Sequence, residues 1–249
     1  RGHNDSSGLH VDYGNENILV QYNFFVDNEG YGTEILGKNK NVIWRYNISV
    51  GDGTRRMKDV RPEGGKSKYP GKTIFVSDFA VPKRIQSEDV YIYNNTYLIR
   101  SGSDPLFEIN GKDVRIWNNA FLVEDGARLA RKVNVGWEQG GAIDMRGNLY
   151  SGTVSPNLIR LDTSPAVAQL VVEGRSSNQE QRPVDYALDQ GAVEKLDAGV
   201  TIDHPVFPMA GEGIFGHVDA IPVVDFFDNV VRDQSKPVGA GYKPGGTKP

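Results

Sequence analysis

Short stretches in which β-branched and aromatic residues alternate with other side chains recur along the first half of the chain. Four of them align, at residues 17–23, 41–47, 89–95 and 113–119. Each begins with a polar residue, continues with Val, Ile, Tyr or Trp, and ends on Asn, a pattern that predicts a short strand followed by a bend. The closing asparagines, Asn23, Asn47, Asn95 and Asn119, are 24, 48 and 24 residues apart, so the period is 24 residues with one irregular turn.

This period predicts an all-β fold, a right-handed parallel β-helix with long loops and a C-terminal capping segment. Each rung of such a solenoid supplies two or three short strands, and neighbouring strands lie about 4.8 Å apart. The repeated asparagines would stack at the bends and form a hydrogen-bonded ladder. The segments have neither the leucine spacing of leucine-rich repeats nor the 3.6-residue period of helical repeats. A β-sandwich or a propeller is the alternative.

The repeat divides the chain into unequal parts. We expect rungs over residues 1–150, the last rungs and a cap over 151–242, and a disordered tail at 243–249. Residues 52–87 break the repeat, and their polar, turn-rich sequence predicts a rung with a long surface loop, which either lines a binding groove or is inert. Because the chain starts within motif-like sequence, we interpret it as a processed or truncated product with further rungs upstream. A boundary chosen for expression is the alternative.

Composition removes several classes of function. The formal net charge is −4, from 28 basic and 32 acidic residues, which argues against a nucleic-acid partner. No apolar run approaches the roughly 18 residues that cross a bilayer, so no membrane partner is expected. The chain has no cysteine, which excludes disulfides, Cys-ligated zinc and thiol catalysis.

Two carboxylates near the start of the chain are the candidate catalytic residues. Asp12 and Glu34 both lie in strand-like sequence, 22 residues apart. This separation differs from the 24-residue period by two, which is an even number. Because side chains alternate between the two faces of a strand, both carboxylates should point to the same face of adjacent rungs. There the two carboxyl groups could approach to about 5–5.5 Å, the separation found in retaining glycosidases. One would attack the anomeric carbon, and the other, with a raised pKa, would protonate the leaving oxygen.

The same region resembles the β-helix glycoside hydrolases, such as the family 120 β-xylosidases. The resemblance rests on Gly8-Leu-His-Val-Asp-Tyr-Gly14, Asp27-Asn-Glu-Gly30 and Thr33-Glu-Ile-Leu36, about 30 of the 249 residues. It implies that Asp12 is the nucleophile and Glu34 the acid/base residue. Tyr13 stands where that family has Trp. A broader group of uncharacterised β-helix proteins carries the same Asp-Asn-Glu-Gly pattern.

Other polar and aromatic residues are candidates for substrate binding. They are His10, Asp27, Glu29, Tyr31 and Arg45. His10 shares the strand face of Asp12, and Tyr31 could stack on a sugar ring. Arg45, with Arg55 and Arg56, could bind an acidic sugar. Each also has a structural interpretation, since Asp27 to Gly30 is turn sequence and an exposed arginine is common.

The leading hypothesis is a secreted or periplasmic glycoside hydrolase that cleaves a poly- or oligosaccharide without a cofactor. The alternative on the same scaffold is a polysaccharide lyase assisted by Ca²⁺, for which Asp12, Asp27 and Glu29 would be the metal site. A third possibility is a non-catalytic, carbohydrate-binding or adhesin-like β-helix. Fold alone does not decide among these.

Overall fold

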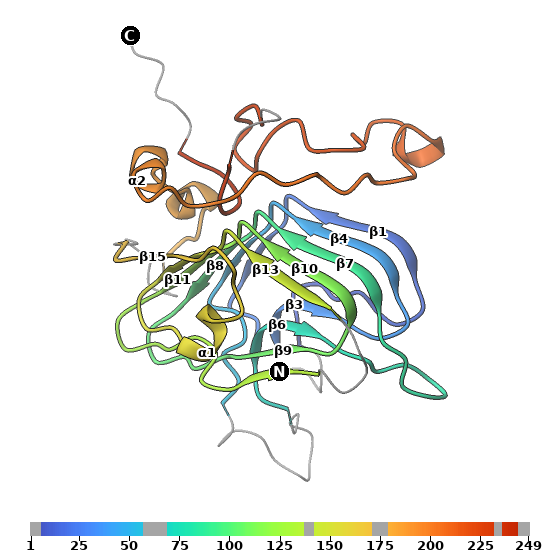
Figure 1. The fold of residues 1–249 in the computed structure, drawn as a ribbon, viewed down its shortest axis with the longest axis horizontal. Helices are drawn as coiled ribbons and strands as arrows, with labels where there is room; N and C mark the ends of the chain where they lie inside the picture. The colour runs from blue at the N-terminus through green and yellow to red at the C-terminus, as the bar shows by residue number, and fades with distance from the viewer. Residues whose placement is uncertain (1–5, 57–68, 137–141, 171–178, 232–235, 244–249) are drawn as a thin grey trace.

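The chain forms a mostly β structure in which short strands make up three parallel sheets (Figure 1). The computed structural model describes residues 6–56, 69–136, 142–170, 179–231 and 236–243. All the strand pairs in the described residues are parallel. The prediction of an all-β fold is therefore confirmed.

The strands are distributed over the three sheets as follows. The first sheet contains β1 (Glu16–Gln21), β4 (Lys40–Arg45), β7 (Glu88–Tyr93), β10 (Lys112–Trp117) and β13 (Ile143–Arg146). The second sheet contains β2 (Phe24–Val26), β5 (Ile48–Val50), β8 (Thr96–Ile99), β11 (Ala120–Val123), β14 (Leu149–Ser151) and β15 (Ala166–Ala168). The third sheet contains β3 (Tyr31–Ile35), β6 (Lys72–Val76), β9 (Leu106–Ile109) and β12 (Val133–Val135).

From β1 to β14 the chain visits the three sheets in turn and returns to the first sheet one strand further along. Val42, Val90 and Val114 are Cα partners in successive strands of the first sheet. Their spacing of 48 and 24 residues is the period of the sequence repeat. The four aligned segments therefore supply the successive strands β1, β4, β7 and β10.

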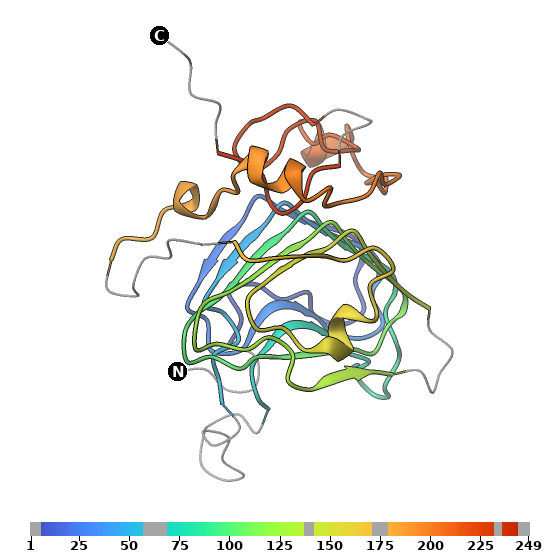
Figure 2. The same ribbon diagram turned by 60° about the vertical axis from the view of Figure 1, so that its left-hand side comes forward.

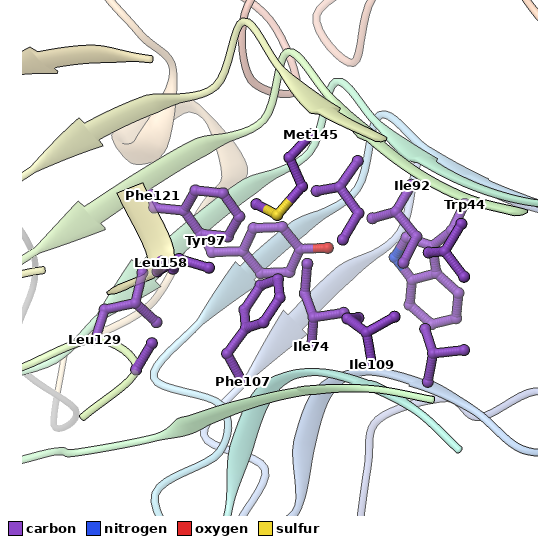
Figure 3. Packing of buried hydrophobic residues seen from close by; sticks show 14 of the residues in the cluster. Trp44, Ile74, Ile92, Tyr97, Phe107, Ile109, Phe121, Leu129, Met145 and Leu158 are labelled. Carbon is purple, nitrogen blue, oxygen red and sulfur yellow. The ribbon is translucent and has the colours of Figure 1, made fainter. Parts of the chain in front are cut away.

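Inward-facing side chains from all three sheets form a common interior (Figure 3). Trp44 and Ile92 come from the first sheet, and Ile74 comes from the third. In the second sheet Tyr97 and Phe121 stack with their ring centroids 5.2 Å apart and their planes 10° from parallel. The burial of this apolar surface stabilises the strands, because a single rung could not bury its inner face alone.

The predicted asparagine ladder is present at the bend between the first and second sheets. Each Asn Nδ2 donates to the Oδ1 of the next asparagine, at 2.9 Å from Asn23 to Asn47, 3.1 Å from Asn47 to Asn95 and 3.0 Å from Asn95 to Asn119. The ladder continues through Asn148, which was not among the four aligned segments. The preceding residue in each case, such as Tyr46 or Asn94, has a positive φ, and this left-handed residue turns the chain.

The irregular turn at 52–87 was predicted to be a rung with a long surface loop, but the position of its strand was not predicted. Its middle contains a strand, β6, which pairs with β3 and β9 in the third sheet. The additional residues are divided between the segments before and after β6, and residues 57–68 lie outside the described part. The alternation in Lys72–Val76 was hard to recognise because Gly, Pro and Lys surround it.

Residues beyond 179 pack against the outer faces of the first and second sheets (Figure 2). Leu188 and Val193, the latter in α2 (Gln190–Lys195), pack with residues of the second sheet, and Phe207 packs with residues of the first. The end of the interior is instead closed by α1 (Pro156–Ile159), whose Leu158 is fully buried in the interior cluster. The segment that closes the interior thus lies within residues 151–242, where the last rungs and the cap were expected, and the described residues beyond 179 lie along the side of the sheets. Of the predicted tail, residues 244–249 lie outside the described part.

Candidate functional site

A cavity of about 840 Å³ lies over the outer face of the third sheet. Along these strands Ile35, Ile74 and Phe107 point into the interior, so their neighbours point outward. Glu34 and Phe75 are Cα partners, and so are Phe75 and Glu108, and all three side chains line the cavity. The pleat of three adjacent strands thus places two carboxylates on one wall.

Glu34 is enclosed by the segment that precedes the first strand. Val11 pairs with Ile35 in an isolated parallel bridge, so His10 and Glu34 are neighbours on the outer face. The Glu34 side chain is 1% exposed, its Oε2 accepts a hydrogen bond from Ser7 Oγ, and the same oxygen lies 3.9 Å from His10 Nδ1. Glu34 is therefore oriented from two sides.

Asp12 lines the same cavity from the other side of Val11 and is exposed. Its Oδ1 accepts a hydrogen bond from the Tyr13 amide at 2.8 Å. The expected parity is observed, since Asp12 and Glu34 both face outward. Asp12 follows Val11, and Glu34 precedes Ile35, the bridge partner of Val11. The two residues are therefore offset by two positions on adjacent strands, which places their Cα atoms about 8 Å apart. They are diagonal neighbours, whereas the direct neighbour of Glu34 is His10.

Lys72 is a cavity residue that the sequence analysis missed. It is 3% exposed, and its Nζ lies 3.7 Å from Glu108 Oε2 and 3.6 Å from the centroid of the Phe75 ring. Burial lowers the pKa of Lys72, and the carboxylates of Glu108 and Glu34 act in the opposite direction. A signal for Glu108 was present, because Glu-Ile at 108–109 repeats the Glu-Ile at 34–35 in strand-like sequence.

The aromatic side chains of the cavity differ in exposure. Tyr31 packs against Phe75 with ring centroids 4.8 Å apart and is only 2% exposed, so it forms part of the wall. Tyr69 and Phe79 are 41% and 43% exposed and also line the cavity. These two rings offer the flat apolar surface on which a sugar can stack. Both come from the irregular turn at 52–87, whose predicted role in lining a groove fits this position.

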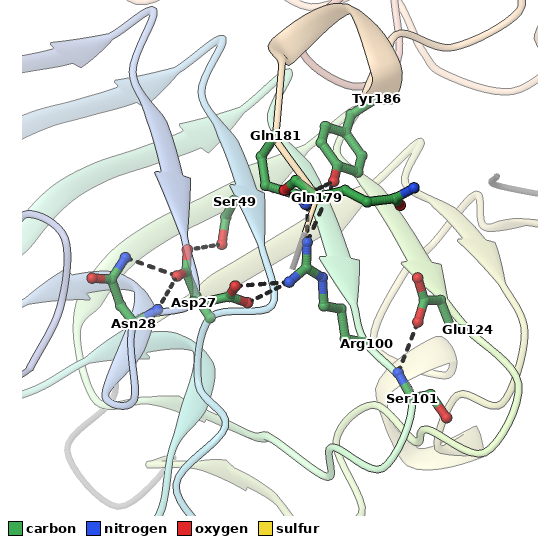
Figure 4. Close-up of polar contacts among 10 residues, drawn as sticks. Asp27, Asn28, Ser49, Arg100, Ser101, Glu124, Gln179, Gln181 and Tyr186 are labelled. Carbon is green, nitrogen blue, oxygen red and sulfur yellow. Dashed lines mark hydrogen bonds and ion pairs between the residues drawn. The ribbon is translucent and has the colours of Figure 1, made fainter. Parts of the chain in front are cut away.

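Asp27, Glu29 and Arg45 do not line the cavity, contrary to their predicted place in the substrate site. Asp27 is paired with Arg100 through hydrogen bonds of 2.7 and 2.8 Å, and Arg100 also donates to Gln181 (Figure 4). Asp27 therefore holds Arg100, and Arg100 links the second sheet to the C-terminal part. The positive φ of 56° at Asp27 directs the chain around the bend before the third sheet begins.

Arg45 is buried at the first sheet, where it donates to Gln21 Oε1 at 2.8 Å and to Tyr93 Oη at 3.1 Å. Glu29 is exposed in the turn before β3. The proposed Ca²⁺ ligands Asp12, Asp27 and Glu29 are thus not gathered in the cavity. Within the described residues, no three His, Asp or Glu side chains form a group that could hold a metal ion.

The described part of the chain contains no helix long and apolar enough to cross a membrane. No protein-family model matches the sequence, and the searches of curated proteins and of solved structures also found no match. The resemblance to β-helix glycoside hydrolases accordingly stays a prediction from the sequence.

Proposed function

We propose that this chain is a right-handed parallel β-helix and that its third-sheet cavity is the active site of a glycoside hydrolase. The three parallel sheets, visited in turn with a 24-residue period, support the solenoid fold. The substrate is a poly- or oligosaccharide, and no cofactor takes part. Because such polymers do not cross a membrane unaided, we expect the protein to act in the periplasm or after secretion.

One observation carries the proposal: Asp12 and Glu34 line a single cavity together with the exposed rings of Tyr69 and Phe79. Paired carboxylates and a stacking surface are the groups that glycoside hydrolysis requires. A Cα separation of about 8 Å allows the two side chains to converge to the 5–5.5 Å of a retaining enzyme.

In the first step, the Asp12 carboxylate attacks the anomeric carbon while Glu34 donates its proton to the departing glycosidic oxygen. The carbon–oxygen bond breaks and a glycosyl ester forms on Asp12. In the second step, Glu34 removes a proton from water, whose oxygen attacks the anomeric carbon and releases Asp12. Ser7 and His10 hold Glu34 in place for both steps.

The test is the release of reducing ends from a panel of polysaccharides and aryl glycosides. Loss of a general acid/base lowers the rate by about 10²–10⁴-fold, so we expect Glu34→Gln and Asp12→Asn to lose at least about 10²-fold in kcat/KM. Glu194→Gln is the matched control, because Glu194 is exposed on α2 and packs away from the third sheet. Near wild-type activity in Glu34→Gln would overturn the assignment.

Lys72 favours a second candidate, a polysaccharide lyase on the same surface. Burial lowers the pKa of Lys72, and a neutral amine could remove the proton next to the carboxylate of a uronic acid. The bond to the leaving oxygen would then break, a carbon–carbon double bond would form, and Glu34 would protonate the oxygen. Unsaturated products that absorb in the ultraviolet, abolished in Lys72→Met, would favour the lyase over the hydrolase.

A further inference from the structure

Two further hollows continue from the third-sheet cavity along the edge between the second and third sheets. One has a volume of about 380 Å³ and shares Pro70, Leu106 and Arg131 with the cavity. The other, of about 460 Å³, shares Gly102, Asp104 and Arg131 with the first hollow. The shared lining residues make the three spaces one continuous surface.

Positive charge dominates the two smaller hollows. Their described lining includes the arginines Arg55, Arg56, Arg128 and Arg131, against a single carboxylate, Asp104. We call this surface the basic groove. It contrasts with the chain as a whole, whose formal net charge is −4. The local positive charge of the basic groove is thus opposite in sign to the net charge of the chain.

The basic groove rests on stacked loops that connect the second sheet to the third. The Gly102 amide donates to Gly126 O at 3.1 Å, and the Arg128 amide donates to Ser103 O at 3.1 Å. The side chain of Arg56 donates to Gly102 O from the preceding loop. Loops held in register in this way fix the backbone positions from which the arginine side chains extend.

The spacing of the arginines suits an extended ligand. Arg56, which is exposed, and Arg131 belong to the segments that precede β6 and β12, and these strands are two apart in the third sheet, or about 10 Å. That distance is comparable to the length of a disaccharide. Arg128 is exposed, and the Arg131 side chain is 55% exposed and lies 3.0 Å from Asp104, so both can reach a ligand in the groove.

We propose that the basic groove binds the anionic substituents, carboxylate or sulfate, of a charged saccharide whose neighbouring sugar occupies the cavity. Guanidinium groups match the geometry of both anions through paired N–H donors. This inference rests on the proposed function and names the substrate class: the cleaved glycan carries negative charge on sugars beside the scissile bond.

The experiment measures binding by calorimetry on the full chain carrying Glu34→Gln, so that no turnover occurs. The probes are polygalacturonate, dextran sulfate and neutral dextran. We expect at least one anionic polymer to bind at least tenfold more tightly than dextran, and the tighter of the two identifies carboxylate or sulfate. Added salt should weaken this binding.

Adding Arg128→Gln and Arg131→Gln should weaken anionic binding at least tenfold, whereas Arg182→Gln, on an exposed arginine outside the groove, should not. Arg56→Gln is a second variant should the double one fold poorly. Equal affinity for dextran, no binding of either anionic polymer, or no loss in the arginine variants would overturn the inference. If the inference fails in one of these ways but the protein hydrolyses a neutral glycan, the proposed function is retained. If anionic polymers bind in an arginine-dependent way but no glycan is cleaved, only the hydrolase assignment is refuted.

Discussion

At the scale of single residues, the bend that follows the second sheet depends on a buried carboxyl group, Asp52. Its Oδ1 accepts hydrogen bonds of 2.8 Å from both the amide and the side chain of Asn28, and its Oδ2 accepts one of 2.6 Å from Ser49. Burial nevertheless dominates and raises the pKa of Asp52 from 3.8 to about 6. The folded protein therefore binds this proton more tightly than the unfolded chain does.

This raised pKa predicts a pH dependence of stability. The contribution of Asp52 is fully present below about pH 4 and is lost as the pH rises through about 6. Asp52→Asn keeps the acceptor for Asn28 and cannot ionise. Relative to this variant, the wild-type protein should lose up to about 3 kcal/mol of unfolding free energy between pH 4 and pH 7. Urea unfolding of both proteins measures the difference, and a difference that does not change with pH would contradict the account.

At the scale of elements, the asparagine ladder links the successive strands at one bend. Asn95 is fully buried, donates to Trp44 O, Tyr93 O and Asn119 Oδ1, and accepts from Asn47. Removing this side chain leaves several buried backbone and side-chain groups without their partners. Each buried polar group without a partner lowers the free energy of unfolding by about 1–3 kcal/mol.

We therefore expect Asn95→Ala to lower the unfolding free energy by about 3 kcal/mol or more. Asn23→Ala is the control, because Asn23 is half-buried and, among the described residues, its side chain donates only to Gln21 O and Asn47 Oδ1. Denaturant titration should rank Asn95→Ala as clearly the less stable variant. Equal stability of the two would mean that the ladder does not hold the strands together.

Some of these elements could be predicted from the sequence, and others could not. The strands of the first sheet and the ladder were predictable, because Val and Ile alternate before an asparagine at a fixed period. The strand β6 was missed because its five residues lie between Gly- and Pro-rich stretches and keep no fixed distance from the other repeats. Lys72 was missed with it.

Within the candidate site, Asp12 and Glu34 were predicted to share a face, since parity follows from the count of residues between them. The position of Arg45 was not predictable in this way. Its strand was recognised, but the contact of its guanidinium with Tyr93 depends on the neighbouring strand, and Asp219 O, 174 residues further along the chain, lies over it at 3.4 Å. Contacts of that range carry no local signal.

At the scale of the whole molecule, the outer face of the third sheet differs from the outer faces of the first and second sheets. The described C-terminal residues cover the outer faces of the first and second sheets, and the cavity on the third sheet is lined by no described residue beyond Asn134. The irregular turn at 52–87 then adds exposed aromatic side chains to that open face. The architecture thus leaves the outer face of the third sheet open, with the carboxylates of Asp12 and Glu34 in its cavity.

In the proposed mechanism, Asp12 forms a covalent bond with a sugar in this cavity. The most direct measurement uses the 2-deoxy-2-fluoro derivative of an aryl glycoside that the protein hydrolyses, followed by mass spectrometry of the digested chain. Because Asp12 is the proposed nucleophile, we expect a glycosyl adduct on the peptide that contains Asp12 and no adduct in Asp12→Asn. An adduct on another carboxylate, such as Glu108, or hydrolysis with inversion and no adduct at all, would contradict this mechanism.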